Sequence, residues 1–304
     1  MTDFSTLSYD TRAAKAYITL NRPERLNAIN DDVPHEISAA VERANADDTV
    51  HVIVLQGAGG AFCAGYDLKV YAEVPGAARW SQGPIWDPIK DYREMKRNTD
   101  DLFTLWRSLK PTIAKVHGYA VAGGSDIALS CDLLIMAEDA RIGYPPARVW
   151  GCPSTAMWVY RLGAQRAKRM LLTGDMITGA TAAEWGLALT AVPPDSLDAT
   201  VEWLADRIAG VPINQLVMQK LMINQAYDNM GLAGTQIIAT LFDGITRHTA
   251  EGRWFKDFSE EHGFHEAVAW RDSGRTIPDG GGAIPEPDQL VSATTTWTSD
   301  EKAP

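Results

Sequence analysis

The chain has 304 residues and a formal net charge of −11, with 22% charged and 45% hydrophobic residues. This composition is ordinary for a globular protein that buries one large core or two smaller ones. The acidic balance argues against nucleic acid as a partner, because phosphate contacts need clustered Lys and Arg. No run approaches the ~18 apolar residues of a membrane span, so a membrane is not an expected partner either.

The three cysteines, Cys63, Cys131 and Cys152, form neither a CxxC pair nor a Cys/His ligand pattern. The sequence therefore predicts no metal site. A sparse, odd count is typical of reduced thiols, and residues 1–4 show no sign of a signal peptide. We expect a cytoplasmic location.

Strands and helices alternate in the first half of the chain. Alternating or continuous apolar, β-branched runs indicate strands, and apolar residues at helical spacing indicate helices. The predicted strands are residues 13–20, 50–55, 111–117 and 132–137, and the predicted helices are residues 33–47 and 123–131. This alternation predicts an α/β fold with crossover connections.

Residues 70–95 show no regular pattern and combine several Pro and Gly residues with Trp80 and Trp86. A long loop with two tryptophans inside a compact domain is more often a pocket lid than a spacer. We expect an irregular lid here.

Helical patterns dominate after about residue 155. The predicted helices are residues 155–162, 164–173, 180–186, 198–210, 213–229, 232–247 and 258–271. These elements predict a C-terminal helical layer. Residues 273–304 contain Gly280-Gly281-Gly282 and little apolar content, so we expect a poorly ordered or draped tail.

Two glycine turns carry the chemical signal. One runs from His117 to Asp126 and opens the helix at Gly123, and the other is Ala64–Leu68. Glycines at a strand-to-helix turn leave backbone N–H groups uncovered at the positive end of the helix dipole. Either turn alone is usually a tight connection, but together they can offer two donors to one oxygen. With a carboxylate three residues after Gly123, this arrangement suits enolate or oxyanion chemistry.

A series of motifs resembles the crotonase, or enoyl-CoA hydratase/isomerase, superfamily over roughly residues 10–260. The matching residues are Asn21-Arg22-Pro23 with Asn27-Ala28, Ala64–Leu68, Gly118–Gly124, Cys131-Asp132-Leu133, Leu172–Asp175, Ala182-Ala183 and Gly186-Leu187. The resemblance implies a crotonase-like spiral of ββα units followed by a C-terminal helical layer. It implies a spiral core with the acyl-CoA site over residues 1–200, trimerisation helices over 201–272 and a tail over 273–304.

The resemblance also implies a ligand and an assembly. The family binds acyl-CoA thioesters, and the matching donors to the thioester oxygen are the amides of Tyr66 and Gly123. The expected substrate and CoA contacts are Arg25, Leu26, Ala28, Ala64, Tyr66, Asp67, Leu68, Lys69, Gly123 and Trp150. Arg22, Arg25 and Lys69 are candidates to meet the CoA phosphates. Coenzyme A is part of the substrate, no separate cofactor is expected, and the assembly would be a homotrimer or a dimer of trimers.

The acid and base residues depart from the family pattern. The position of the first family glutamate carries Asp126, and the second glutamate is replaced by Pro146, which cannot transfer a proton. Asp126 is then the single acid/base, and its place at a helix N-terminus predicts a lowered pKa that favours a base. Tyr144 is one candidate replacement for the lost glutamate. The other candidates are Asp87, Asp91 and Glu94, whereas His117 is expected to bond backbone.

Trp150 and Cys152 are expected near the pocket wall. The aromatic set Trp80, Trp86, Tyr144 and Trp150 predicts an apolar acyl group that is branched or carries a ring. Three functions stay open at this point. They are an acyl-CoA hydratase or isomerase with one carboxylate, a hydrolase or C–C lyase on a cyclic or aromatic acyl-CoA, and a non-catalytic acyl-CoA binder.

Overall fold

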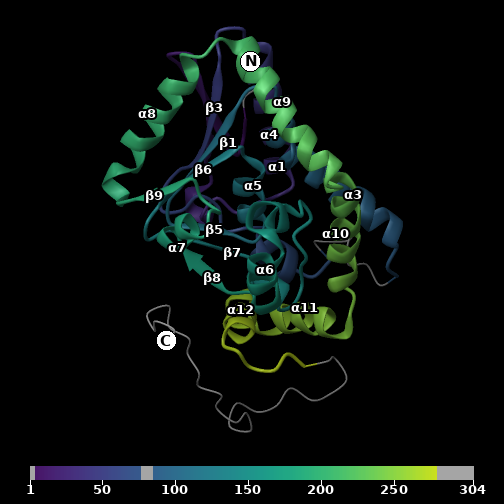
Figure 1. Ribbon diagram of the computed structural model, residues 1–304. Coiled ribbons are helices and arrows are strands. Elements are labelled where there is room, and N and C mark those ends of the chain that lie inside the picture. The colour runs from purple at the N-terminus through teal and green to yellow at the C-terminus, as the bar shows by residue number, and fades with distance from the viewer. Residues whose placement is uncertain (1–3, 77–84, 279–304) are drawn as a thin grey trace.

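The structure is a computed structural model that describes residues 4–76 and 85–278. Two sheets form its centre (Figure 1), one ordered β1-β2-β3-β4-β6-β9 and the other β5-β7-β8. Pairing is parallel except between β1 and β2 and between β7 and β8. The strands are β1 Leu7–Arg12, β2 Lys15–Leu20, β3 Val52–Gly57, β4 Thr112–Val116, β5 Tyr119–Val121, β6 Leu133–Ala137, β7 Arg141–Gly143, β8 Met176–Thr178 and β9 Thr190–Val192.

Helices cover both faces of the larger sheet, which explains why all side chains of residues 52–55 in β3 are fully buried. α8 packs on β3, β4 and β6, and α1 packs on β1 and β2. The helices are α1 Asp32–Ala46, α3 Pro88–Leu102, α4 Thr104–Arg107, α5 Gly123–Ser130, α6 Met157–Thr173, α7 Gly179–Glu184, α8 Leu197–Ala209, α9 Ile213–Asn229, α10 Leu232–Thr246, α11 Ala250–His262 and α12 Phe264–Asp272. Short helical turns are η1 Pro23–Arg25, the π-helical η2 Lys69–Glu73, η3 Pro145–Ala147 and η4 Pro194–Ser196.

The expected α/β architecture with a C-terminal helical layer is confirmed. The predicted strand over 13–20 begins only at Lys15, because Ala13 and Ala14 have φ angles of +48° and +62° and form the tight turn after β1. Most strands that the sequence did not predict have three residues, which is too short for periodicity to be visible. One of them, β5, separates β4 from the Gly123 turn.

Two expectations about local structure are wrong. The described residues between 70 and 95 are mostly helical, because η2 occupies Lys69–Glu73 and α3 begins at Pro88. The carboxylate of Asp87 caps α3 by accepting the N–H groups of residues 89 and 90. The single helix predicted over 258–271 is broken at Gly263, where φ is +89°. Trp80 and most of the predicted tail lie outside the described residues.

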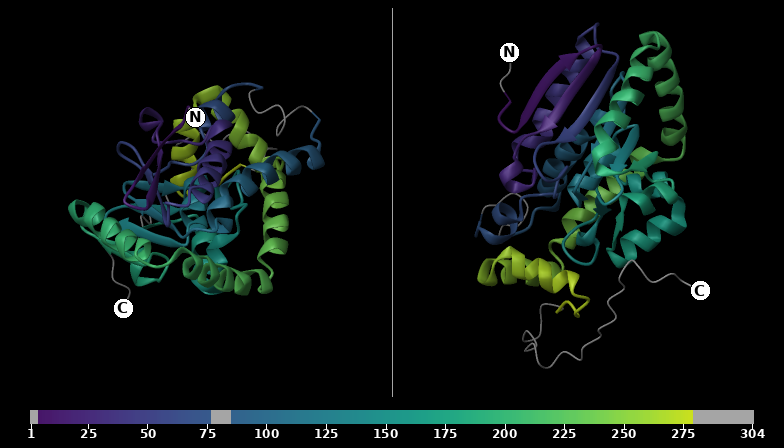
Figure 2. Two further views of the ribbon diagram at one scale, coloured as in Figure 1. Left: turned by 90° about the horizontal axis from the view of Figure 1, so that it is seen from above. Right: turned by 90° about the vertical axis from the view of Figure 1, so that its left-hand side faces the viewer.

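The C-terminal helices close one end of the molecule. Figure 2 shows α11 and α12 in yellow-green at the end opposite the purple N-terminal strands. α10 lies along α3, and α11 packs on η2, where Phe255 and Phe258 join Ala72 in a small buried cluster. Within the described part of the chain, every helix is too short or too polar to cross a membrane.

Candidate active site

The two glycine turns lie in contact. Gly65 has a φ angle of +91°, and a Cβ atom added there would lie 2.8 Å from the carbonyl oxygen of Val121 and 3.4 Å from the nitrogen of Gly123. Only glycine fits both this backbone conformation and this close approach. The two turns are far apart along the chain, and the fold brings their backbones together.

The amides of Tyr66 and Gly123 are left available by the local pairing. A parallel bridge uses the N–H of Ile29 toward the Gly65 carbonyl at 2.8 Å and the N–H of Asp67 toward the Ile29 carbonyl at 2.9 Å. This bridge skips the Tyr66 N–H. Gly123 is the first residue of α5, so no helical carbonyl lies one turn earlier to accept its N–H. In residues 4–76 and 85–278, neither N–H donates to another protein group.

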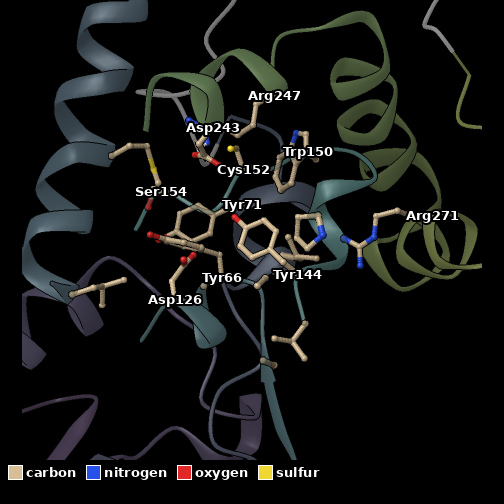
Figure 3. Close-up of a pocket in the computed structure, with 18 residues that line it drawn as sticks. Tyr66, Tyr71, Asp126, Tyr144, Trp150, Cys152, Ser154, Asp243, Arg247 and Arg271 are labelled. Atoms are coloured by element: carbon tan, nitrogen blue, oxygen red, sulfur yellow. Dashed lines mark hydrogen bonds and ion pairs between the residues drawn. The ribbon is translucent and has the colours of Figure 1, made fainter. Parts of the chain in front are cut away.

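One cavity extends from the two glycine turns to the C-terminal helices (Figure 3). Of the residues expected at the site, those that line it are Ala64, Tyr66, Leu68, Gly123, Asp126, Tyr144, Pro146, Trp150 and Cys152. Val121 and Ala122 of the Gly118–Gly124 motif also line it, and the lining residues that the sequence did not single out are Tyr71, Met95, Leu102, Ser154, Asp243, Arg247 and Arg271. The wall is therefore largely apolar and aromatic, with a few charged groups.

Several predicted CoA contacts lie outside this cavity. Its lining does not include Arg25, Leu26, Ala28, Asp67 or Lys69. Arg25 and Lys69 are exposed on the surface, where their contact with CoA stays a prediction. Arg22 is already engaged, because its guanidinium bonds the Asp67 carboxylate at 3.1 Å and the Ala28 carbonyl.

Asp126 is 3% exposed and accepts a hydrogen bond of 2.5 Å from the hydroxyl of Thr155. Burial raises the pKa of Asp126 to about 8, which the Thr155 bond opposes and the charge of Asp243 reinforces. The expected lowering of this pKa by the helix N-terminus is therefore wrong, because desolvation outweighs the dipole. At neutral pH this carboxyl group holds its proton.

A second carboxylate, Asp243 of α10, enters the cavity. It is 6% exposed, accepts the backbone N–H of Cys152 at 3.1 Å, and pairs with the guanidinium of Arg247. Arg247 also bonds the fully buried Asp91 at 2.6 Å. The side chain of Asp91 in turn accepts the indole N–H of Trp86 at 2.9 Å. These contacts form one buried network that runs from the cavity wall, at Asp243 and Arg247, to residues behind it.

Of the residues that could replace the missing glutamate, some line the cavity and others do not. Tyr144 lines the cavity, and burial together with the charges of Asp126 and Asp243 raises its pKa well above the usual value, so its hydroxyl stays protonated. Asp87 caps α3, and Glu94 pairs with Arg97 at 3.0 Å. Neither carboxylate reaches the cavity, and both expectations are wrong.

Two further expectations are settled by contacts outside the cavity. Asp91 stands behind Arg247 and does not line the wall, so the expectation that it reaches in is wrong. Trp86 likewise lies behind the wall, where its ring stacks on His248 with centroids 4.3 Å apart. The ring nitrogen of His117 bonds the Gly59 carbonyl at 2.8 Å, as the sequence predicted.

Asp243 is the main site residue that sequence reasoning missed. A signal was present: Asp243 and Arg247 are the charged residues of 232–247 and stand four residues apart, the spacing of a helical ion pair. Charged side chains are rarely buried unless they are paired, and this spacing supplies such a partner.

Comparison with known proteins agrees with this fold. The family model for enoyl-CoA hydratase/isomerase matches residues 10–265. A crystal structure of an enoyl-CoA hydratase from Mycobacterium smegmatis is 51% identical and has a TM-score of 0.84, covering 90% of this chain and 96% of that one. The probable enoyl-CoA hydratase echA8 of Mycobacterium bovis is 31% identical over 219 residues, covering 70% of this chain and 78% of the relative.

Another relative is the (E)-benzylidenesuccinyl-CoA hydratase of Thauera aromatica. It is 32% identical over 255 residues, covering 81% of this chain and 92% of the relative. The fold and the paired glycine turns define a crotonase-type, acyl-CoA-processing enzyme. The chain belongs to the enoyl-CoA hydratase/isomerase family.

Proposed function

We propose that this enzyme holds the thioester oxygen of an acyl-CoA between the amides of Tyr66 and Gly123 and moves a proton at the α-carbon with Asp126. The observation that carries the proposal is the buried carboxyl of Asp126, with a pKa of about 8, in the cavity that both glycine turns line. A pKa near the working pH lets one group both donate and accept a proton.

The chemistry follows from where charge develops. Removing an α-proton, or adding a nucleophile at the β-carbon, moves negative charge onto the thioester oxygen. Two fixed N–H donors aimed at that oxygen stabilise the enolate by about 3–4 kcal/mol each, because they need no reorganisation. Protonated Asp126 then delivers its proton to the α-carbon, and its conjugate base removes it in the reverse direction.

The cavity wall supports an apolar acyl group that carries a ring or a branch. Tyr66, Tyr71, Tyr144 and Trp150 surround the space beside Asp126. The Thauera relative is named for an acyl-CoA with a benzylidene group, which agrees with such a wall. We expect cinnamoyl-CoA to turn over faster than crotonyl-CoA; a strong preference for crotonyl-CoA would remove this part of the proposal.

Deuterium exchange tests the central claim. Butyryl-CoA and 3-phenylpropanoyl-CoA, which cannot be hydrated, are incubated with the enzyme in D₂O near pD 8, and α-deuteration is followed by mass spectrometry. Wild type is expected to exchange, whereas Asp126→Asn should bind the same thioesters without exchanging them. Exchange that survives in Asp126→Asn removes this residue from the mechanism. No exchange in wild type favours a non-catalytic binder.

The assembly is part of the same proposal. α9 and α10 expose many apolar side chains, among them Met218, Met222, Ile223, Ile238 and Phe242. Exposed apolar surface of this extent is typical of a subunit interface. We therefore propose a homotrimer or dimer of trimers, located in the cytoplasm, and sedimentation of the purified protein tests the assembly.

A further inference from the structure

We propose that Asp243 on α10 is the second acid/base group of the site and activates the water that adds to the β-carbon of an enoyl-CoA. This inference rests on the proposed function, because it assigns Asp243 a role beside Asp126 and the two amides. It makes the enzyme a hydratase even though Pro146 occupies the position of the second family glutamate.

The placement of Asp243 is the first argument. Among the described residues, Asp126 and Asp243 are the two carboxylates that line the cavity. Figure 3 shows them entering from opposite sides, Asp126 from α5 below and Asp243 from α10 above. Pro146 lines the same space. A carboxylate from a helix that is distant in the sequence thus faces the region where Pro146 stands in place of the second family glutamate.

The partners of Asp243 hold it as a charged acceptor. One oxygen accepts the Cys152 N–H at 3.1 Å, and the other pairs with Arg247. The guanidinium is itself fixed on its far side by Asp91 at 2.6 Å. A carboxylate with a buried guanidinium partner and a backbone donor keeps its negative charge. Its remaining lone pairs can accept the proton of a water molecule in the cavity.

The two carboxylates also interact electrostatically. The charge of Asp243 contributes to the raised pKa of Asp126, of Tyr144, and of Cys152, which reaches about 12. In each case burial is the largest cause. Like charges that share a cavity do not ionise together, so one group keeps a proton while the other is charged. Since Arg247 neutralises Asp243, Asp126 is the member that stays protonated.

The reaction then balances. Asp243 takes one proton from water as the water oxygen forms its bond to the β-carbon. The π electrons of the Cα–Cβ bond move onto the thioester oxygen, which the Tyr66 and Gly123 amides stabilise. As the enolate collapses, Asp126 gives its proton to the α-carbon. The product is a 3-hydroxyacyl-CoA, and transfer of one proton from Asp243 to Asp126 restores the starting state.

Asp243→Asn is the test variant, because the amide keeps the size of the side chain and an oxygen for the Cys152 N–H. Asp91→Asn is the matched control: it removes the other ion pair of Arg247, on the side away from the cavity, and leaves the carboxylate of Asp243 in place. Crotonyl-CoA and cinnamoyl-CoA serve as hydration probes. We expect kcat for hydration to fall at least 100-fold in Asp243→Asn, as for loss of a general base, and less than tenfold in Asp91→Asn.

Exchange separates this inference from the proposed function. In Asp243→Asn, α-deuteration of butyryl-CoA and 3-phenylpropanoyl-CoA should still be detected, because Asp126 is intact. Equal losses of hydration in the two variants overturn the inference, and so does a wild type that exchanges α-protons but hydrates neither probe. Absence of exchange in wild type would instead refute the proposed function.

A pH profile keeps the inference testable if Asp243→Asn does not fold. Wild-type kcat/KM for hydration should fall on the alkaline side, because it needs Asp126 protonated. The alkaline limb should lie near pH 8, the pKa that burial gives Asp126. The other titratable groups nearby are Arg247 at the C-terminal end of α10, Asp91 of α3, His248, and the protonated Tyr66, Tyr144 and Cys152. A profile with no alkaline limb contradicts the division of roles between Asp243 as the base and a protonated Asp126 as the acid.

Discussion

Replacing Asp126 with Asn should make the protein more stable at neutral pH while it abolishes proton transfer. The carboxyl is buried, no cation pairs with it among residues 4–76 and 85–278, and the hydroxyl of Thr155 is its side-chain donor. An asparagine oxygen can accept the same hydrogen bond. The substitution therefore removes the cost of a buried ionisable group and leaves the packing nearly unchanged.

The magnitude follows from the pKa. In the unfolded chain this carboxyl titrates near 3.8, and in the folded protein it titrates near 8. Between these values the folded state holds a proton that the unfolded state has released, so stability falls as pH rises. The slope is about 1.4 kcal/mol per pH unit, which gives roughly 2.7 kcal/mol between pH 5 and pH 7. Below the unfolded pKa the group costs nothing.

Urea unfolding of wild type and Asp126→Asn at equal protein concentration measures this cost. The difference between the two free energies of unfolding should grow by about 2–3 kcal/mol in favour of the variant from pH 5 to pH 7. Other titrating groups cancel in that difference. A difference that stays constant over this range would show that Asp126 is not protonated in the folded enzyme, and would refute the assignment of its pKa.

Two further predictions concern neighbours of Asp126. Gly65→Ala forces a Cβ atom to 2.8 Å from the Val121 carbonyl oxygen at a φ of +91°, and this displaces the Tyr66 amide. The kcat should fall about 100-fold, as for loss of one oxyanion donor. Wild-type turnover would contradict the role of this amide. Thr155→Val removes a hydrogen bond that lowers the pKa of Asp126, so the alkaline limb of kcat/KM should move up by about one pH unit. A downward move would contradict the direction of that effect.

The parts of the site that the sequence predicted are those with local signals. The turns at Ala64–Leu68 and Gly118–Gly124 are visible because glycine is required at a positive φ or at a close backbone approach. The long helices α9 and α10 are visible because their patterns run for several turns. Each of these features depends on a short stretch of chain.

The parts that were not predicted depend on packing between distant segments. The carboxylate of Asp243 reaches the cavity because α10 lies along α3, and the sequence of residues 232–246 does not indicate that α3 packs against it. The direction of the Asp126 pKa was mistaken for the same reason. The helix dipole is a local property, whereas the desolvation that outweighs it comes from the cavity walls that other segments supply.

The partners of the two cavity carboxylates explain how one site can hold both an acid and a base. Asp243 has Arg247 beside it, so its charge is neutralised and its ionised form is retained. Asp126 has a hydroxyl instead of a cation, so burial keeps its proton on. Two aspartates are thus given different roles by what each one contacts, a guanidinium or a hydroxyl. On this argument the guanidinium of Arg247, although it touches no reacting atom, decides which carboxylate acts as the base.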